Sequence, residues 1–172
     1  HMYNTQASAM LGLSMHGVNI AEMERAVDVL QSLPEVDSEQ IGCFGMSLGG
    51  ITTMLLSAID LRIKFACISG HVTSYRAVFL DDTHCSCTDT PGIALAFEHS
   101  DITSLIAPRP LVVESGIADP TFHVDAAISS VAEIRKNYDL LDSSEKLAHD
   151  IHDGAHVISG AVAYAWFEKW MK

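Results

Sequence analysis

The chain has 172 residues, of which 48% are hydrophobic and 19% are charged, a composition typical of one globular domain with a buried core. Its 22 acidic and 10 basic residues give a formal net charge of -12, which argues against a nucleic-acid partner because a polyanion would be repelled. No stretch approaches the roughly 20 apolar residues of a membrane helix, and the N-terminus lacks a signal-peptide pattern. We therefore expect a cytoplasmic protein with a single domain over residues 3–172, preceded by His1-Met2 as a remnant of a cleaved tag.

The first half of the chain alternates between helical and strand-like patterns. Apolar residues recur at helical spacing after Gly17, and Pro34 ends that pattern. The predicted elements are a helix over residues 17–33, a buried strand over 41–45, a helix over 48–59 and a second buried strand over 62–69. Residues 70–100 show little periodicity, and we expect an irregular segment of the kind that is often functional.

The second half continues the alternation. Asp101 is the expected N-cap of a short helix that ends at Ile106, before Pro108. The elements that follow are a strand over residues 110–114, a helix over 121–138, a weaker strand over 147–151 and a closing helix whose apolar stripe runs from 158 to 170. Alternating strands and helices imply βαβ units. The expected fold class is α/β, with about four mainly parallel strands and helices on both faces of the sheet.

Four cysteines raise the question of a disulfide or a metal site. Cys43 and Cys67 lie in the predicted strands, where a free cysteine behaves as a small hydrophobic residue. Cys85 and Cys87 follow His84 and could in principle bind a metal, but structural zinc usually needs two spaced pairs of ligands, and no second pair is visible. We therefore interpret them as incidental thiols in a loop, and we predict no disulfide framework, metal or cofactor.

The hexapeptide GMSLGG at residues 45–50 carries the strongest chemical signal. It matches the G-x-S-x-G nucleophile elbow, in which small flanking residues let a serine occupy a tight turn between a strand and a helix. A serine hydroxyl is a weak nucleophile and needs an adjacent base. Ser47 is the predicted nucleophile, and the N–H of Leu48 is the predicted first donor to the oxyanion. The alternative is a glycine-rich turn with an idle serine.

A serine nucleophile of this type also needs a carboxylate and a histidine, in the chain order Ser, Asp, His. Asp119 lies just beyond the strand predicted over residues 110–114, and His156 lies in the loop after the last predicted strand. Because the carboxyl ends of parallel strands meet at one edge of a sheet, these residues can converge beside the elbow. His156 would accept the Ser47 proton, and Asp119 would hold the imidazole in the required tautomer.

Other side chains compete for these roles. His149 and His152 precede His156, but they lie at the last predicted strand, where packing roles are more common. Asp125 follows Asp119 but falls inside the next predicted helix. Three further histidines are candidate substrate contacts or ordinary surface residues: His71, His84 and His123.

With these residues in place, the sequence resembles the dienelactone-hydrolase and acetyl-xylan-esterase-like branch of the α/β hydrolases. The matching stretches are RAVD at 25–28, LPEVD at 33–37, IGCFGMSLGG at 41–50, IAPRPL at 106–111, ESGIADP at 114–120 and GAH at 154–156. The resemblance implies that Ser47, Asp119 and His156 are the nucleophile, the acid and the base.

The resemblance covers only part of that fold. Members of this branch carry several strands and a helix before the first helix seen here, including the loop that gives the second oxyanion donor. The chain therefore resembles a reduced, N-terminally truncated α/β hydrolase whose elbow strand lies at the edge of the sheet. An uncovered edge invites pairing, so we expect a homo-oligomer, most simply a two-fold dimer.

The expected function is that of a serine carboxylesterase acting on short acyl esters, such as acetyl esters on carbohydrates. A half-sized fold offers little material for a deep acyl tunnel, which is why short acyl groups are favoured. Two alternatives remain open: a catalytically silent binding or structural module, and a thioesterase or peptidase that uses the same three residues.

Overall fold

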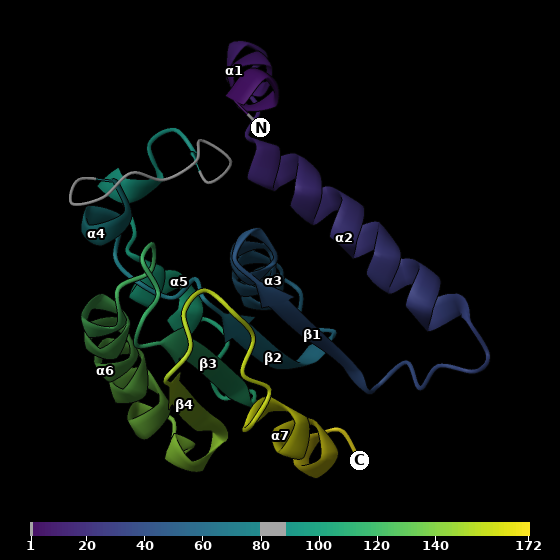
Figure 1. The fold of residues 1–172 in the computed structure, drawn as a ribbon. Helices are drawn as coiled ribbons and strands as arrows, with labels where there is room; N and C mark the ends of the chain where they lie inside the picture. Colours follow the sequence, from purple (N-terminus) through teal and green to yellow (C-terminus); the bar gives the residue numbers. More distant parts are fainter. Residues whose placement is uncertain (1, 80–88) are drawn as a thin grey trace.

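The computed structural model describes residues 2–79 and 89–172, and it has an α/β fold (Figure 1). His84, Cys85 and Cys87 lie outside the described residues. In chain order the elements are α1 (Met2–Met10), α2 (Met15–Ser32), β1 (Ile41–Met46), α3 (Leu48–Ile59), β2 (Ile63–Ser69), α4 (Tyr75–Phe79), the 3-10 helix η2 (Ile93–Leu95), α5 (His99–Ser104), β3 (Leu111–Gly116), α6 (Val124–Leu140), the 3-10 helix η3 (Ser144–Lys146), β4 (Leu147–His152) and α7 (Ala163–Trp170).

The centre of the molecule is a sheet of four parallel strands in the order β1-β2-β3-β4. Parallel strands need crossover connections, which α3, the α4–α5 segment and α6 supply in turn. All four strands therefore end at the same edge of the sheet. The fold class expected from the sequence is confirmed.

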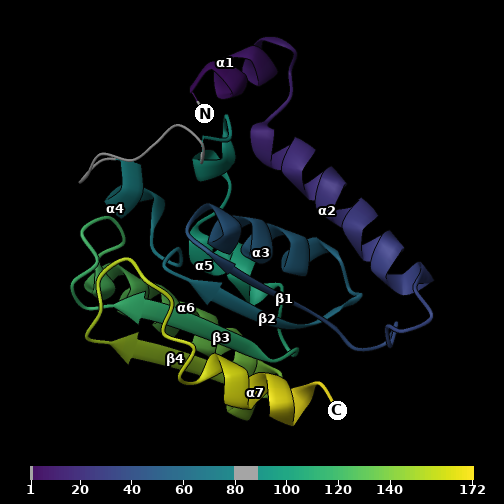
Figure 2. The same ribbon diagram turned by 45° about the vertical axis from the view of Figure 1, so that its right-hand side comes forward.

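Helices cover the sheet on both faces, as the two views show (Figure 2). On one face, Ala66, Ile68, Leu111 and Val113 pack with residues of α3, α5 and α6 in a single core cluster. On the other face, Phe65, Cys67 and Val112 pack against α7 and its aromatic side chains. Alternate residues of β2 and β3 thus enter opposite layers, which explains why these strands are apolar throughout.

The strand β1 lies at one edge of the sheet and is less covered than its neighbours. Only Ile41 is buried along β1, whereas every residue of β3 is buried. Helix α2 packs beside this edge through Ile20 and Val27, which contact Ile41 and Leu56. The N–H and C=O groups on the outer side of β1 have no strand partner within the described ranges.

The last helix begins later than predicted, at Ala163. Residues 153–162 form a loop instead, and Gly160 has a φ of 70°, which a helix does not permit. The N–H groups of Ser159 and Gly160 donate to the buried carboxylate of Glu114, at 3.2 and 2.8 Å. These two N–H groups bond to a side chain of β3, so the apolar stripe does not start a helix at residue 158.

The short helix α5 also differs in its cap. The N-cap is Glu98. Asp101 is the N3 residue of the capping box, and its carboxylate accepts the Glu98 N–H at 2.8 Å. The prediction of Asp101 as the N-cap was wrong because a glutamate took that role. Within the irregular segment expected over residues 70–100, the described part contains the short pieces α4 and η2.

Cys43 and Cys67, the two cysteines within the described residues, are free thiols. Burial raises the pKa of both, so each is held as a neutral thiol. Across residues 2–79 and 89–172, no helix is long and apolar enough to cross a membrane.

Candidate active site

Ser47 occupies the turn between β1 and α3, where its backbone takes the unusual dihedral angles φ 57° and ψ −117°. A positive φ is costly for a residue with a Cβ, and such strain is common at functional sites. The turn is held on both sides, because the Ser47 N–H donates to the Ser69 carbonyl at 3.0 Å and the Ser47 carbonyl accepts the Ile51 N–H at 3.1 Å. The geometry is that of a strand–turn–helix elbow with a serine at its tip.

Two of the three glycines around Ser47 are required by close contacts. A Cβ at Gly45 would lie 2.1 Å from the Gly49 carbonyl oxygen, and a Cβ at Gly50 would lie 2.9 Å from the Ser69 carbonyl oxygen. A Cβ at Gly49 would meet nothing within 4 Å. Gly45 and Gly50 therefore allow the strand and the helix to approach, whereas Gly49 has no such packing role.

Asp119 and His156 are joined by a hydrogen bond of 2.7 Å between Oδ2 and Nδ1. Asp119 lies three residues past the end of β3, with its side chain 1% exposed, and His156 lies four residues past the end of β4, with its side chain 30% exposed. The other carboxylate oxygen accepts the N–H groups of Thr121 and Phe122, at 2.9 and 3.0 Å. Three donors therefore hold the Asp119 carboxylate, and Nε2 of His156 remains to accept a proton.

The turn after β2 joins this pair to the elbow. Gly70 has a φ of 54°, and a Cβ there would lie 3.2 Å from Nδ1 of His156. The preceding residue, Ser69, accepts the Ser47 N–H. Gly70 itself donates to the Glu114 carbonyl at 3.0 Å. The structure thus brings the three predicted residues to the same edge of the sheet, around the Ser69–Gly70 turn.

A row of aromatic rings lies beneath His156. The ring of Phe122 stacks on His156 with centroids 5.4 Å apart and contacts His71 in a tilted arrangement at 4.9 Å. His71 in turn stacks on His99 at 5.3 Å. Because the same Phe122 also donates its N–H to Asp119, it contacts both Asp119 and His156. The sequence carried no signal for this role beyond an apolar residue near Asp119.

His71 is 1% exposed, so the structure does not support a contact with substrate. Burial lowers the pKa of His71 well below its ordinary value and that of His99 to about 4, which keeps both rings neutral. Both side chains are therefore part of the buried core next to the elbow.

The residues that compete with His156 and Asp119 for their roles make other contacts or lie at the surface. His149 on β4 bonds to the Ser115 hydroxyl at 3.0 Å, and burial lowers its pKa to about 4. His152 accepts the Gly154 N–H through Nδ1 at 3.1 Å. His123 and Asp125 are exposed at the beginning of α6.

Leu48, the predicted oxyanion donor, is the first residue of α3. The first N–H groups of a helix have no intrahelical partner, and the helix dipole adds partial positive charge there. This position suits a negative oxygen next to Ser47. Among the described residues, no group of three or more His, Cys, Asp or Glu side chains is arranged to hold a metal ion.

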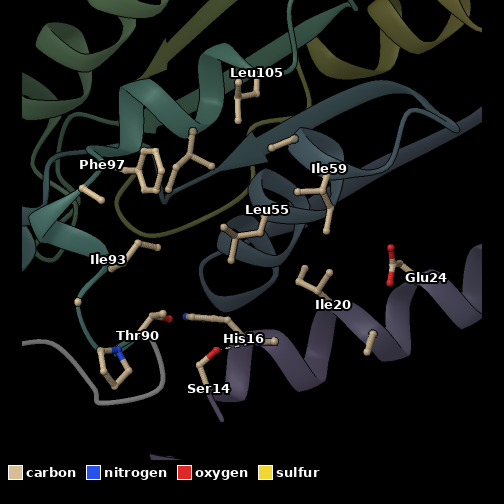
Figure 3. A pocket seen from close by; sticks show the side chains of 17 residues that line it. Ser14, His16, Ile20, Glu24, Leu55, Ile59, Thr90, Ile93, Phe97 and Leu105 are labelled. Atoms are coloured by element: carbon tan, nitrogen blue, oxygen red, sulfur yellow. Dashed lines mark hydrogen bonds between the residues drawn. The ribbon is translucent and has the colours of Figure 1, made fainter. Parts of the chain in front are cut away.

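An apolar hollow of about 720 Å³ lies between α2, α3 and the segment that follows residue 90. Figure 3 shows the side chains of Ile20, Leu55, Ile59 and Phe97 around it. None of Ser47, Asp119 and His156 lines this hollow. It is therefore separate from the candidate active site.

Comparison with known proteins gives matches at the level of family and fold. Residues 18–113 match the family described as BAAT / acyl-CoA thioester hydrolase C terminal. The putative hydrolase YtaP of Bacillus subtilis (strain 168) is 35% identical over 115 residues, which make up 64% of this chain and 38% of that protein.

Solved structures agree on the fold. A putative acetyl xylan esterase from Bacteroides fragilis NCTC 9343 superposes with a TM-score of 0.80 at 14% identity, over 97% of this chain and 51% of that one. A carbohydrate esterase family 15 glucuronoyl esterase from Caldicellulosiruptor kristjansonii gives 0.70 at 18% identity, over 87% and 47%. The chain spans about half of each of these structures and 38% of the Bacillus relative. The likeness confirms the α/β-hydrolase fold predicted from the sequence.

Proposed function

The chain belongs to the BAAT / acyl-CoA thioester hydrolase C-terminal family, and from this premise we propose that it is a serine hydrolase that cleaves carboxylic esters. The observation that carries the proposal is the 2.7 Å bond from His156 to Asp119, located against the turn whose carbonyl group accepts the Ser47 N–H. A nucleophile, a base and an orienting acid are the three parts that acyl transfer needs.

The first half of the proposed reaction acylates Ser47. The Ser47 Oγ attacks the ester carbonyl carbon while Nε2 of His156 takes the hydroxyl proton. The carbonyl oxygen becomes an oxyanion, which the Leu48 N–H stabilises. When the tetrahedral intermediate collapses, the C–O bond to the alcohol breaks and His156 returns the proton to the leaving alkoxide. The products are an alcohol and an acyl-Ser47 ester.

The second half repeats these steps with water. His156 takes a proton from the water as its oxygen attacks the acyl carbon, and then gives that proton to Ser47 Oγ as the acid leaves. Asp119 stabilises the imidazolium in both halves, and its buried carboxylate fixes the tautomer with the proton on Nδ1.

The proposed substrates are short acyl esters, such as acetyl esters on carbohydrates. The apolar hollow between α2 and α3 is not lined by Ser47, so it does not supply an acyl tunnel that opens at the nucleophile. The fold shared with a putative acetyl xylan esterase supports the carbohydrate part of this proposal. Comparing kcat/KM for acetyl, butyryl and octanoyl p-nitrophenyl esters, and release of acetate from acetylated xylan, would test it. Faster turnover of the octanoyl ester would contradict it.

Thioester hydrolysis is a second candidate, favoured by the family match. The same three residues can attack a thioester, since the leaving thiolate replaces the alkoxide. Acetyl-CoA and p-nitrophenyl acetate compared at equal concentration would decide between the two. A kcat/KM higher for acetyl-CoA would assign the chain to thioesters.

The decisive test of the active site is Ser47→Ala. We expect it to abolish turnover of p-nitrophenyl acetate above the background of imidazole catalysis, because no nucleophile remains. Ser129→Ala, at an exposed serine of α6, is the matched control and should keep full activity. A fluorophosphonate probe should label the wild-type protein and not Ser47→Ala. Absence of labelling in the wild type would instead favour a silent binding or structural module.

We also propose that two copies of the chain associate along β1. The unpaired outer edge of this strand and its partial exposure support such pairing, because exposed strand edges recruit further strands. Size-exclusion chromatography with light scattering should then give twice the chain mass at micromolar concentration. A monomer under these conditions would contradict the proposal.

A further inference from the structure

Glu114 carries a carboxylate that is buried within the sheet, and the reaction proposed above does not use it. It lies on β3, five residues before Asp119, with 0% of its surface exposed. Burying a charge is costly unless hydrogen bonds replace its hydration. Within the described residues, no Lys or Arg side chain forms an ion pair with it. Its stabilisation therefore comes from other groups.

Those groups are backbone N–H donors from the loop that carries His156. Oε2 of Glu114 accepts the Ser159 N–H at 3.2 Å, and Oε1 accepts the Gly160 N–H at 2.8 Å. The Ser159 hydroxyl adds a third link, because it donates to Asp150 Oδ2 on β4 at 2.7 Å. Both oxygens of Glu114 are thus committed to residues three and four positions after His156. We refer to these three bonds as the loop anchor.

The other side of the same loop is held by the end of β3. The Ile117 N–H donates to the His152 carbonyl at 2.9 Å, and the Ala118 N–H donates to the Gly154 carbonyl at 3.1 Å. His156 lies between this attachment and the loop anchor. Its ring position is therefore determined by β3 on both sides, and Asp119 projects from the segment that follows the same strand.

The backbone of Glu114 adds a link toward the elbow. Its carbonyl oxygen accepts the N–H of Gly70, the residue at which a Cβ would lie 3.2 Å from the His156 ring. Glu114 thus bonds through its side chain to the loop of the base and through its main chain to the turn beside Ser47.

From this geometry we propose that Glu114 is a positioning residue for His156, which acts by holding residues 159 and 160 so that the imidazole stays between Asp119 and Ser47. The proposal rests on the proposed function, since it assigns His156 as the base. A carboxylate suits the task because it accepts two N–H groups at once. A glutamine offers one carbonyl oxygen and would present an NH₂ group to the second donor.

The test is Glu114→Gln, compared with Asp60→Asn. Asp60 is also a buried carboxylate, 6% exposed and paired with Arg62 at 2.7 Å, but it lies before β2, at the end of the sheet opposite the site. Both variants should lower the Tm. We expect only Glu114→Gln to lower kcat for p-nitrophenyl acetate, by on the order of 10²-fold with little change in KM, because a displaced base costs about that much. Asp60→Asn should keep the wild-type kcat.

A second readout separates this proposal from the proposed function. An imidazole N–H bonded to a carboxylate gives a far-downfield proton NMR signal, which His156→Ala would assign. This signal should broaden or vanish in Glu114→Gln and persist in Asp60→Asn, whether or not the wild type turns over esters. An inactive wild type with this pattern would overturn the esterase and leave the positioning role standing.

Wild-type kcat and an unchanged signal in folded Glu114→Gln would overturn the positioning role. If that variant does not fold, Glu114→Asp decides, because it keeps a carboxylate on β3 but shortens the side chain by one methylene group, away from the Ser159 and Gly160 N–H groups. It should lower kcat several-fold and broaden the same signal. An unaltered kcat and signal in Glu114→Asp would then overturn the proposal.

Discussion

The two sides of the candidate active site are built in different ways. On the β1 side, Ser47 is held by its own neighbours: a tight turn, a strained φ of 57° and glycines that let strand and helix touch. On the β3–β4 side, Asp119 and the loop that carries His156 are held by bonds between residues 37 to 46 positions apart in the chain. The position of Ser47 is thus encoded in six consecutive residues, whereas the position of His156 depends on the assembled sheet.

The largest effect on stability is expected on the β1 side, from Gly45→Ala. Its Cβ would lie 2.1 Å from the backbone oxygen of Gly49 in α3, and a helix backbone cannot move aside. We expect a loss of about 3 kcal/mol in the free energy of unfolding, together with loss of activity. Gly49→Ala is the matched control, because its Cβ meets nothing and alanine favours a helix, by about 0.5–1 kcal/mol. Urea denaturation measures both, and equal destabilisation would show that the elbow is not limited by this contact.

A smaller loss of stability is expected on the other side, from Gly116→Ala. Its Cβ would lie 2.2 Å from the Ala155 carbonyl oxygen, but that oxygen belongs to a loop, whose backbone is displaced at a lower cost than that of a helix. We expect a loss of roughly 1–2 kcal/mol in unfolding free energy, with a larger fall in kcat than in stability because the shifted loop carries His156. If Gly116→Ala destabilised the chain as much as Gly45→Ala, the proposed difference between the two sides would be wrong.

The smallest expected effect on stability is a pH dependence that comes from buried histidines. Burial lowers the pKa of His99 to about 4, so between about pH 6.5 and 4 the unfolded chain binds a proton that the folded chain excludes. Stability should therefore fall as the pH drops below about 6.5, by about 1 kcal/mol from His99 at pH 5.5. His71 and His149 act in the same direction. Thermal unfolding of His99→Gln should show a shallower pH dependence, and an unchanged slope would exclude His99 as a source.

What could be predicted from the sequence follows the same division. Ser47 and its flanking elements were predictable because the elbow motif is local. That Asp119 and His156 lie together was predictable from chain order and from the rule that parallel strands end at one edge. The start of α7 was not, because the Ser159 and Gly160 donors bond to a carboxylate 45 and 46 residues away.

Glu114 is the one charged residue in a predicted strand that is otherwise apolar. A lone glutamate at residue 114, after a run of Leu and Val in a predicted buried strand, implies a charge that something must satisfy. The sequence could not identify its partners, because they are backbone N–H groups of a distant loop, and such groups do not depend on residue type. The same limit applies to Phe122, whose contact with His156 depends on how two loops meet.

The backbone of Ser47 has a consequence for how such a chain can change over time. A glycine at this position would adopt a positive φ without strain, so the folded protein would gain stability at the moment it lost the proposed nucleophile. Selection for stability alone would therefore favour glycine over serine at this position.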